Sequence, residues 1–498
     1  MNIRPYPSVL YYAAIVAVIL FSFFSFSYAY YPFFNSDSAL AVLMSFDYHF
    51  PADLYCWGQD RGGTLEMMLA HFFIQLFNSG PLLTASIIHY LLLIAGLAAA
   101  FQFVRKPFYR LALSIAWFFP SYFFIENVLY QFGIQFSLFM IALFFFSKVI
   151  NSEKRKSLLL SLVCFFMILN AWVLDLGFIP AFFFIVFVIY YFFTTKKRTG
   201  SLTPGFTTFF NIKNIILVLL WITGGIFFIG YAKIRASGIN SFPGYVFNNP
   251  EGIFNVLLSI LNSIRGIMLF QWKPMESLYF YSAIFFLTLF SRTNRNAISN
   301  RSFFSSFLLW QSLLSLLLLL FIRQVELSIV PSRYFTGCYL SLVVSILMKM
   351  DESTSPNMLL KVSLSTVLTF SVFSSLYESY FPKKLGPMVK NFQALEKLQP
   401  VGVIGSYWNS YVFSGIDPVH IKATAHEGDN VRNIGVAYET LEQPTLLLIQ
   451  NEWLRNFPDS ISQFGTLLIK NGDPFLIGTY FSWDEENPVI ACQYKTAR

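Results

Sequence analysis

Charged residues are scarce in this chain, and that scarcity excludes an ordinary soluble protein. Only 12% of the 498 residues are Asp, Glu, Lys or Arg, whereas 56% are apolar and the mean hydropathy is +0.57. Soluble domains carry charge on about one-quarter of their residues. The composition therefore predicts an integral membrane protein.

Cysteine and the sequence patterns of common cofactor sites are also nearly absent. The four cysteines are too few for a disulfide framework. Only Cys56 and Cys492 are expected outside the membrane, where we favour two free thiols. Gly402 and Gly405 do not complete the three-glycine fingerprint of dinucleotide sites. The histidines lack metal-ligand spacing, including His49, His71 and His89. We therefore expect no cofactor, and a divalent metal is open but not indicated.

Apolar runs, in contrast, recur up to residue 377. A helix needs about 20 mostly apolar residues to cross the hydrocarbon core, with a range of roughly 17–25. Two further apolar stretches, at 64–78 and within 230–276, are expected to form outer juxtamembrane helices. Eleven runs are predicted to span the membrane: 9–29, 81–104, 108–125, 129–147, 156–172, 175–193, 212–231, 277–291, 303–322, 334–348 and 358–377. Several of them are short, so one or two could instead be re-entrant or merged.

The distribution of basic residues predicts the orientation of these spans. With the N-terminus in the cytoplasm, seventeen Lys and Arg residues fall on the inner side and seven on the outer side. This bias predicts a multi-pass plasma (inner) membrane protein whose C-terminus is extracytoplasmic. The net charge of +8 then reflects topology, so no nucleic-acid partner is expected.

The composition changes after residue 377. Residues 378–498 hold 13 of the 26 acidic residues and contain no spanning run. Their pattern is mixed, with helical spacing at 386–399 and 456–464, buried-strand runs at 401–406 and 445–450, and a strand–turn–strand pattern from Leu467. We predict a polytopic all-α transmembrane domain at 1–379 and a small extracytoplasmic α/β domain at 380–498.

Acidic residues concentrate in the first predicted outer loop. Five of the 13 that precede residue 378 lie within a 30-residue stretch: Asp37, Asp47, Asp53, Asp60 and Glu66. A carboxylate held against a bilayer is costly, which makes it a candidate functional group. Asp37 follows the first span directly, so we favour function there. Asp47 and Asp53 are equally compatible with a solvated surface.

Two patterns in this loop, NSDSA at 35–39 and GQDRGGTLE at 58–66, carry a family resemblance. They resemble the first outer loop of GT-C membrane glycosyltransferases, where many bacterial members read S-D-E-A and then Y-G-Q-x-x-x-G-S-L-E. Trp57 and Thr64 replace the Tyr and the Ser of that pattern. Ser38 replaces the second acid, which leaves Asp37 without its acidic neighbour.

A second motif extends the resemblance. PSRYF at 331–335 is similar to the Pro-x-Arg-Tyr sequence at the start of a late span in the same superfamily. The expected topology, with eleven spans, outer juxtamembrane helices and a soluble outer domain, fits as well. Within the superfamily, the chain resembles bacterial proteins similar to dolichyl-phosphate-mannose–protein mannosyltransferases.

The resemblance implies transfer of a hexosyl or pentosyl group from a polyprenyl-phosphate donor to a cell-envelope glycan, lipid or protein. An attacking hydroxyl can lose its proton to a carboxylate within hydrogen-bond reach. We assign that role to Asp37, with Glu66 as the second catalytic carboxylate. A leaving phosphate needs Arg or Lys. Arg333 is the first candidate, followed by Arg61 and Arg235.

Further substrate-binding candidates are Gln59, Asp60, Tyr334 and Asp175. Structural roles compete with several assignments. Asp175, at a tight outer turn, could satisfy turn amides, and Arg333 could be only an interfacial anchor. Tyr407, Trp408 and Tyr411 could stack on a sugar, but their helical spacing favours a place in the core.

Two other functions fit a chain with many spans, namely a transporter or flippase of lipid-linked glycans and a polymerase of such glycans. Transporters place ionisable groups near the bilayer midplane on broken spans, whereas the carboxylates here gather in an outer loop. Lipid-linked glycan polymerases usually rely on a large late outer loop, and the loop at 323–333 is short. We therefore favour the glycosyltransferase.

Overall fold

The computed structural model describes residues 6–151, 155–199, 211–236, 247–271, 273–293, 303–327, 332–353, 357–381, 388–481 and 486–497. The chain divides into two compact units, each built from separate stretches of sequence. The first unit comprises Met1–Ser22, Leu91–Gly230 and Phe242–Lys383, and the second comprises Phe23–Tyr90, Tyr231–Ser241 and Lys384–Arg498. The second unit thus joins the first outer loop to the C-terminal region. A domain boundary at 379/380 stays a prediction.

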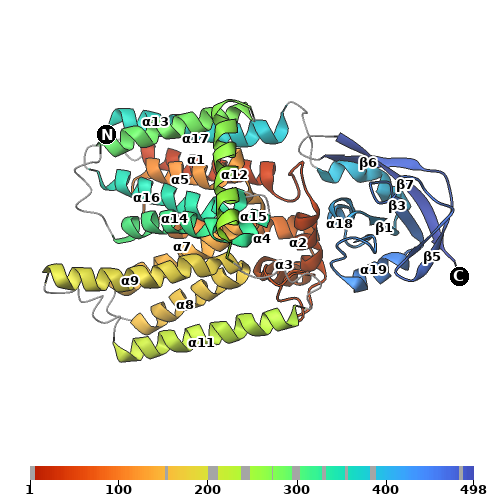
Figure 1. Ribbon diagram of the computed structural model, residues 1–498, viewed down its shortest axis with the longest axis horizontal. Coiled ribbons are helices and arrows are strands. Elements are labelled where there is room, and N and C mark those ends of the chain that lie inside the picture. Colours follow the sequence, from red (N-terminus) through yellow and green to blue (C-terminus); the bar gives the residue numbers. More distant parts are fainter. Residues whose placement is uncertain are drawn as a thin grey trace. The chain divides into compact units, whose positions relative to one another are not determined.

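A helix stands at each of the eleven predicted spans (Figure 1): α1 (Tyr6–Phe26), α4 (Pro81–Ala100), α5 (Pro107–Phe118), α7 (Gln131–Asn151), α8 (Lys156–Val173), α9 (Phe178–Thr199), α11 (Ile212–Arg235), α13 (Pro274–Thr293), α14 (Phe303–Leu320), α16 (Thr336–Glu352) and α17 (Met358–Tyr380). Within the described residues, seven of them are each long and apolar enough to cross a membrane: α1, α4, α7, α8, α11, α14 and α17. The polytopic helical membrane domain is confirmed.

The predicted span 108–125 is broken and does not form one continuous helix. α5 ends at Phe118, and the chain then bends by 69° into η1 (Tyr122–Phe124) and α6 (Glu126–Leu129). Pro120 explains the break, because proline has no backbone N–H and its ring clashes with a continuing helix. The Ser371 hydroxyl donates to the Phe119 carbonyl at 2.7 Å, which satisfies a backbone acceptor at the break.

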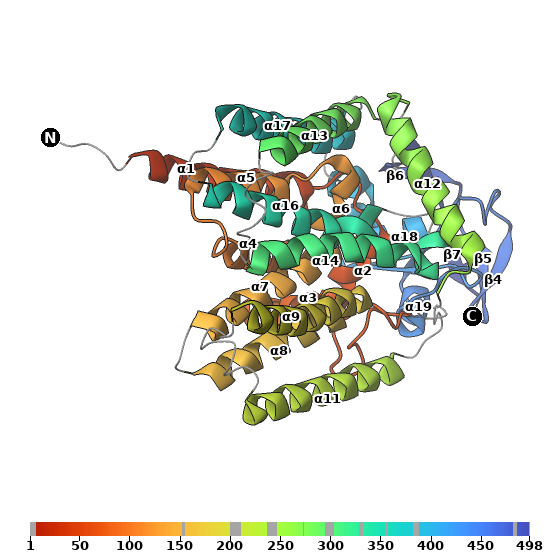
Figure 2. The same ribbon diagram turned by 60° about the vertical axis from the view of Figure 1, so that its left-hand side comes forward.

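Both predicted outer juxtamembrane segments form helices. They are α3 (Leu65–Phe77) and α12 (Pro250–Met268), and a further short apolar helix, α2 (Ser36–Phe46), precedes α3. Figures 1 and 2 show α12 running across the direction of α14 and α16, whereas α13 and α17 lie side by side. A helix that crosses a bundle in this way is suited to lie in the membrane interface.

The C-terminal region of the second unit contains one seven-stranded mixed sheet with the order β2-β1-β3-β7-β5-β4, and β6 also pairs with β7. β1 is parallel to β2 and β3, and every other pair is antiparallel. The strands are β1 (Val401–Gly405), β2 (Ile421–Ala425), β3 (Thr445–Ile449), β4 (Ser460–Gln463), β5 (Thr466–Lys470), β6 (Phe475–Phe481) and β7 (Glu486–Thr496).

Two helices, α18 (Tyr407–Ile416) and α19 (Ile434–Leu441), cover opposite faces of the sheet. A Cβ at Gly402 would lie 2.2 Å from the Thr440 carbonyl oxygen of α19, so only glycine fits there. A Cβ at Gly405 would point toward Ser410 of α18. Positions three apart in a strand face opposite ways. The two helices therefore lie on opposite faces. Strands β1 and β3 confirm the predicted strands at 401–406 and 445–450, and the helices and sheet together confirm the α/β class.

The predicted helix at 456–464 is wrong. Residues Ser460–Gln463 form strand β4, which pairs antiparallel with β5. The two-residue turn between them has positive φ at both Phe464 and Gly465, as in the hairpin turns that match strand twist. Of the stretch predicted as helical at 386–399, the structure describes residues 388–399. There η5 (Met388–Leu398) consists of 3₁₀ turns with a kink at Phe392, so it is tighter than an α-helix.

Single cysteines test the predicted orientation. In a background whose native cysteines are replaced by Ala, Lys470→Cys should react with a membrane-impermeant maleimide added to intact cells. Lys197→Cys should react only after permeabilisation, because the positive-inside rule places it in the cytoplasm. Gel-shift labelling measures both, and the reverse pattern would put the acidic first loop on the cytoplasmic face.

Candidate functional site

The candidate residues are divided between the two units. The second unit holds Asp37, Gln59, Asp60, Arg61, Glu66 and Arg235, and the first unit holds Asp175, Arg333 and Tyr334. The role of each residue stays a prediction from the sequence, to which the structure adds the surroundings of the side chain.

The glycine-rich motif forms a closed turn. Tyr55 pairs with Gly63 in an antiparallel bridge, and the Cys56 amide donates to the Gly62 carbonyl at 2.8 Å. Gly58 has a φ of +65°, in the left-handed region that favours glycine. The side chains of Gln59, Asp60 and Arg61, which lie within this turn, are partly exposed.

Asp53 organises this loop from inside. One carboxylate oxygen accepts from Trp57 Nε1 at 2.9 Å, and the other accepts from the His49 amide at 2.7 Å. The Asp53 carbonyl accepts from the Thr64 hydroxyl at 2.5 Å. Asp53 is buried, so the solvated-surface alternative is wrong for it, whereas the Asp47 side chain is 46% exposed.

Asp37 lies in the first turn of α2. Asn35 caps this helix by accepting from the Ser38 amide at 3.1 Å. Asp37 is partly buried, and its Oδ1 accepts a 2.5 Å hydrogen bond from the Tyr407 hydroxyl of α18. The neighbouring Ser36 hydroxyl donates back to the Tyr407 carbonyl at 2.5 Å. Two hydrogen bonds of opposite direction thus join the first turns of α2 and α18.

Tyr407 is held firmly on its own side. It is 3% exposed, and its amide donates to Asp429 at 2.7 Å. The Arg432 guanidinium lies 4.7 Å from the centre of its ring and donates to the Gly58 carbonyl at 3.4 Å. Burial raises the pKa of Tyr407, and the negative charge of Asp37 raises it further. The phenol is therefore a proton donor at physiological pH.

Glu66 occupies a separate buried network at the start of α3. Its Oε1 accepts from the Tyr28 hydroxyl at 2.8 Å and lies 3.1 Å from His89 Nδ1. The side chains of Glu66 and His89 are each 2% exposed. Among the described residues, Oε2 of Glu66 has no hydrogen-bond partner. One oxygen is thus fixed by protein, and the other is a buried acceptor that no described residue satisfies.

Basic groups accompany this loop in the second unit. Lys233, near the end of α11, lies 5.7 Å from the ring centre of Tyr55 in the motif turn. Arg235 is exposed and stacks 5.5 Å from the ring of Tyr231, one turn earlier in the helix. Arg432 adds a cation that sequence reasoning missed, because no local pattern marks a residue of the C-terminal region as a neighbour of Gly58.

The remaining candidates lie in the first unit. Arg333 is partly buried in the short 3₁₀ turn η4 (Ser332–Phe335) that precedes α16. Tyr334 packs edge-on against Phe132 at 5.9 Å. Asp175 is buried in η2 (Asp175–Gly177), where the Asn170 side-chain amide donates to the Gly177 carbonyl at 2.8 Å.

The first unit also contains a buried carboxylate that sequence reasoning missed. Glu276, in the first turn of α13, accepts a short hydrogen bond from the Ser374 hydroxyl of α17. Ser374 accepts in turn from the Tyr122 amide at 3.1 Å, at the bend beyond Pro120. This carboxylate joins α13, α17 and the broken helix, so its surroundings fit a structural role.

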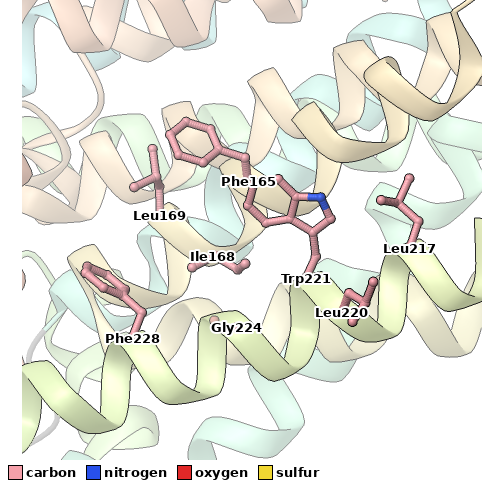
Figure 3. A pocket seen from close by; sticks show the side chains of 9 residues that line it. Phe165, Ile168, Leu169, Leu217, Leu220, Trp221, Gly224 and Phe228 are labelled. Carbon is pink, nitrogen blue, oxygen red and sulfur yellow. The ribbon is translucent and has the colours of Figure 1, made fainter.

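An apolar groove runs between α8 and α11 in the first unit. Its volume is about 460 Å³, and Figure 3 shows side chains of both helices along it, among them Phe165, Ile168, Leu169, Leu217, Trp221 and Phe228. A Cβ at Gly225 would press on Ile168 at 2.7 Å, whereas a Cβ at Gly224 would meet nothing within 4 Å. The groove is therefore open beside Gly224.

The described part of the chain contains no cluster of metal-ligating side chains and no disulfide bond. No group of three or more His, Cys, Asp or Glu side chains is placed there to hold a metal ion. No disulfide joins any two of the four cysteines, all of which lie in the described residues. What the second unit offers is a pair of carboxylates, Asp37 and Glu66, each held through one oxygen by a tyrosine hydroxyl.

Comparisons with known proteins find similarity in structure but not in sequence. No protein-family model matches the chain, and no curated protein matches it. Among solved structures, it is similar to the crystal structure of ArnT from Cupriavidus metallidurans in the apo state, with a TM-score of 0.44 and 10% identity over 97% of each chain. A similarity at this TM-score and identity does not establish a family, so function has to be argued from the chemistry of the site.

Proposed function

We propose that this protein is a membrane glycosyltransferase that moves a sugar from a polyprenyl-phosphate donor to a cell-envelope acceptor on the extracytoplasmic face. The observation that carries the proposal is Asp37, a partly buried carboxylate directly after the first span, held through one oxygen by Tyr407. The motifs around Asp37 and Glu66 supply the link to sugar transfer. The acceptor is a glycan, a lipid or a protein.

In the proposed reaction, an acceptor hydroxyl forms a bond to the anomeric carbon of the donor sugar. The bond from that carbon to the phosphate oxygen breaks, and the polyprenyl phosphate leaves. The hydroxyl proton passes to Asp37, the general base. Its place in the first turn of α2 supports this role, because a helix N-terminus favours negative charge.

Glu66 is proposed to orient a substrate. Its Oε1 is tied to Tyr28 and lies beside His89, while Oε2 has no partner among the described residues. A sugar hydroxyl that donates to Oε2 would satisfy this buried acceptor, which otherwise costs free energy. Gln59, Asp60 and Asp175 are proposed as further sugar contacts, with Tyr334 as a stacking surface.

Cations are proposed to bind the donor phosphate without a metal. Arg333 is the first candidate, because a guanidinium can hold two phosphate oxygens at once. Arg61 and Arg235 are the reserves. Charge on the leaving phosphate grows as the glycosidic bond breaks, so a fixed cation stabilises the transition state more than the ground state.

The α8–α11 groove is proposed to take part of the polyprenyl chain. Its lining is almost wholly apolar, and it lies between two helices long and apolar enough to cross a membrane. Each isoprenoid methylene that is transferred from water into the groove stabilises the bound donor by about 0.8 kcal/mol of free energy. Such a groove explains why an enzyme of sugar transfer would need so large a membrane domain.

Asp37→Asn tests the proposed function. The change is nearly isosteric, so the variant should insert and fold, while transfer falls by at least ~10²-fold, as for loss of a general base. The assay is turnover of purified protein with a radiolabelled polyprenyl-phosphate sugar. Asp47→Asn, in the same loop but exposed, is the control and should be almost unaffected. Full activity in Asp37→Asn would remove it from the mechanism.

Arg333→Lys and Arg333→Ala test the phosphate clamp. Activity should fall in the order Arg, Lys, Ala, because Lys offers one point charge and Ala none. The loss should appear in kcat as well as in KM for the donor. If Arg333 is only a headgroup anchor, Lys will restore wild-type turnover, and that result would defeat the clamp.

Gly224→Leu tests the groove by filling it. Loss of one or two buried CH₂ contacts at about 0.8 kcal/mol each should raise KM for a long-chain donor about 4- to 15-fold. A donor with a short prenyl chain should bind equally well to both proteins. Gly230→Leu is the matched control, since it lies on α11, outside the lining, and also has open space at its Cβ. Equal KM values for Gly224→Leu and Gly230→Leu would exclude the groove.

A further inference from the structure

We infer that Tyr407 is a positioning residue for Asp37, so that the C-terminal region completes the proposed active site. The inference rests on the proposed function, because it takes Asp37 to be the base. The two residues are 370 positions apart, and their side chains meet in a 2.5 Å hydrogen bond within the second unit.

The direction of this hydrogen bond matters for catalysis. Burial and the charge of Asp37 raise the pKa of Tyr407, so the phenol keeps its proton and the carboxylate accepts. A hydrogen bond to an ionised acceptor is stronger than one between neutral groups. Oδ1 of Asp37 is thereby fixed, and the described residues place no hydrogen-bond donor on Oδ2. Oδ2 is the oxygen that we assign to the acceptor hydroxyl.

Tyr407 is itself rigid enough to act as a positioning group. Ser36 donates to its carbonyl and Asp429 accepts from its amide, so its backbone is bound at two points. The guanidinium of Arg432 lies over its ring, and the Tyr411 hydroxyl accepts from the Arg432 amide at 2.9 Å. A buried tyrosine held by backbone and ring can fix the orientation of the carboxylate that it contacts.

Packing keeps the two helices in register. A Cβ at Gly415 of α18 would lie 2.7 Å from the Cβ of Ala39 in α2, so the helices approach as closely as glycine permits. The neighbouring strand β6 contributes Tyr480. Burial and the charge of Asp37 together raise the pKa of Tyr480 to about 12. Two tyrosines of the C-terminal region therefore lie in the electrostatic field of one carboxylate of the first outer loop.

Tyr407→Phe tests the inference, because it removes the hydroxyl and keeps the ring that Arg432 covers. We expect kcat to fall about 10- to 100-fold, the scale for a misplaced catalytic group, with KM changed less than about twofold. In an Asp37→Asn background the same substitution should cost almost nothing further, since the two side chains act as a unit.

Tyr494→Phe is the matched control. Tyr494 is 1% exposed, and its hydroxyl donates to the Pro458 carbonyl at 2.7 Å, so this variant also loses one buried tyrosine hydrogen bond in the C-terminal region. It should lower the unfolding temperature and leave kcat unchanged. Thermal unfolding of all variants separates loss of folded protein from loss of turnover.

The outcomes distinguish this inference from the function on which it rests. Wild-type kcat in Tyr407→Phe, with Asp37→Asn inactive, would overturn the positioning role alone. If Tyr407→Phe lowered kcat by the same factor in the wild-type and Asp37→Asn backgrounds, Tyr407 would act independently of Asp37. That result would also overturn the positioning role. Full activity in Asp37→Asn would overturn both the base and its positioning partner.

Discussion

The hydrogen bond from Tyr407 to Asp37 is the interaction on which the organisation of the second unit depends. It joins the first turn of α2 to the first turn of α18, and the bond from Ser36 to the Tyr407 carbonyl returns across the same junction. The close approach at Gly415 leaves no room for the helices to slide. The first outer loop, which follows the first span, thereby packs with the C-terminal α/β region in one compact unit.

Burial of charge explains the rest of the loop. A carboxylate removed from water must be hydrogen-bonded, or its free energy rises. Asp53 meets this demand with donors from its own loop, and so serves the local structure. Asp37 and Glu66 each satisfy one oxygen through a distant tyrosine hydroxyl. Two carboxylates with one fixed oxygen apiece suit a site that binds and deprotonates hydroxyl groups.

The helices could be predicted from the sequence because each long apolar run had a single physical solution in a bilayer. Pro120 was overlooked inside such a run, and its missing N–H broke the helix at Phe118. Residues 456–464 misled because a two-residue turn at Phe464 and Gly465 made a hairpin from an apparently helical spacing. The partner of Asp37 had no local signature at all, since the favoured reading of Tyr407 and Tyr411 was core. Both are buried, whereas the same prediction is wrong for Trp408, which is 54% exposed.

The central claim is that a sugar is cleaved from its lipid phosphate at this site. The most direct measurement places the purified protein in liposomes with a polyprenyl-phosphate sugar, labelled in both sugar and phosphate, and an acceptor added outside. The account predicts that sugar label moves to the acceptor, that polyprenyl phosphate remains in the bilayer, and that a nucleotide sugar gives no transfer. Movement of the intact lipid-linked sugar from one leaflet to the other, with both labels still joined, would contradict it and identify a flippase.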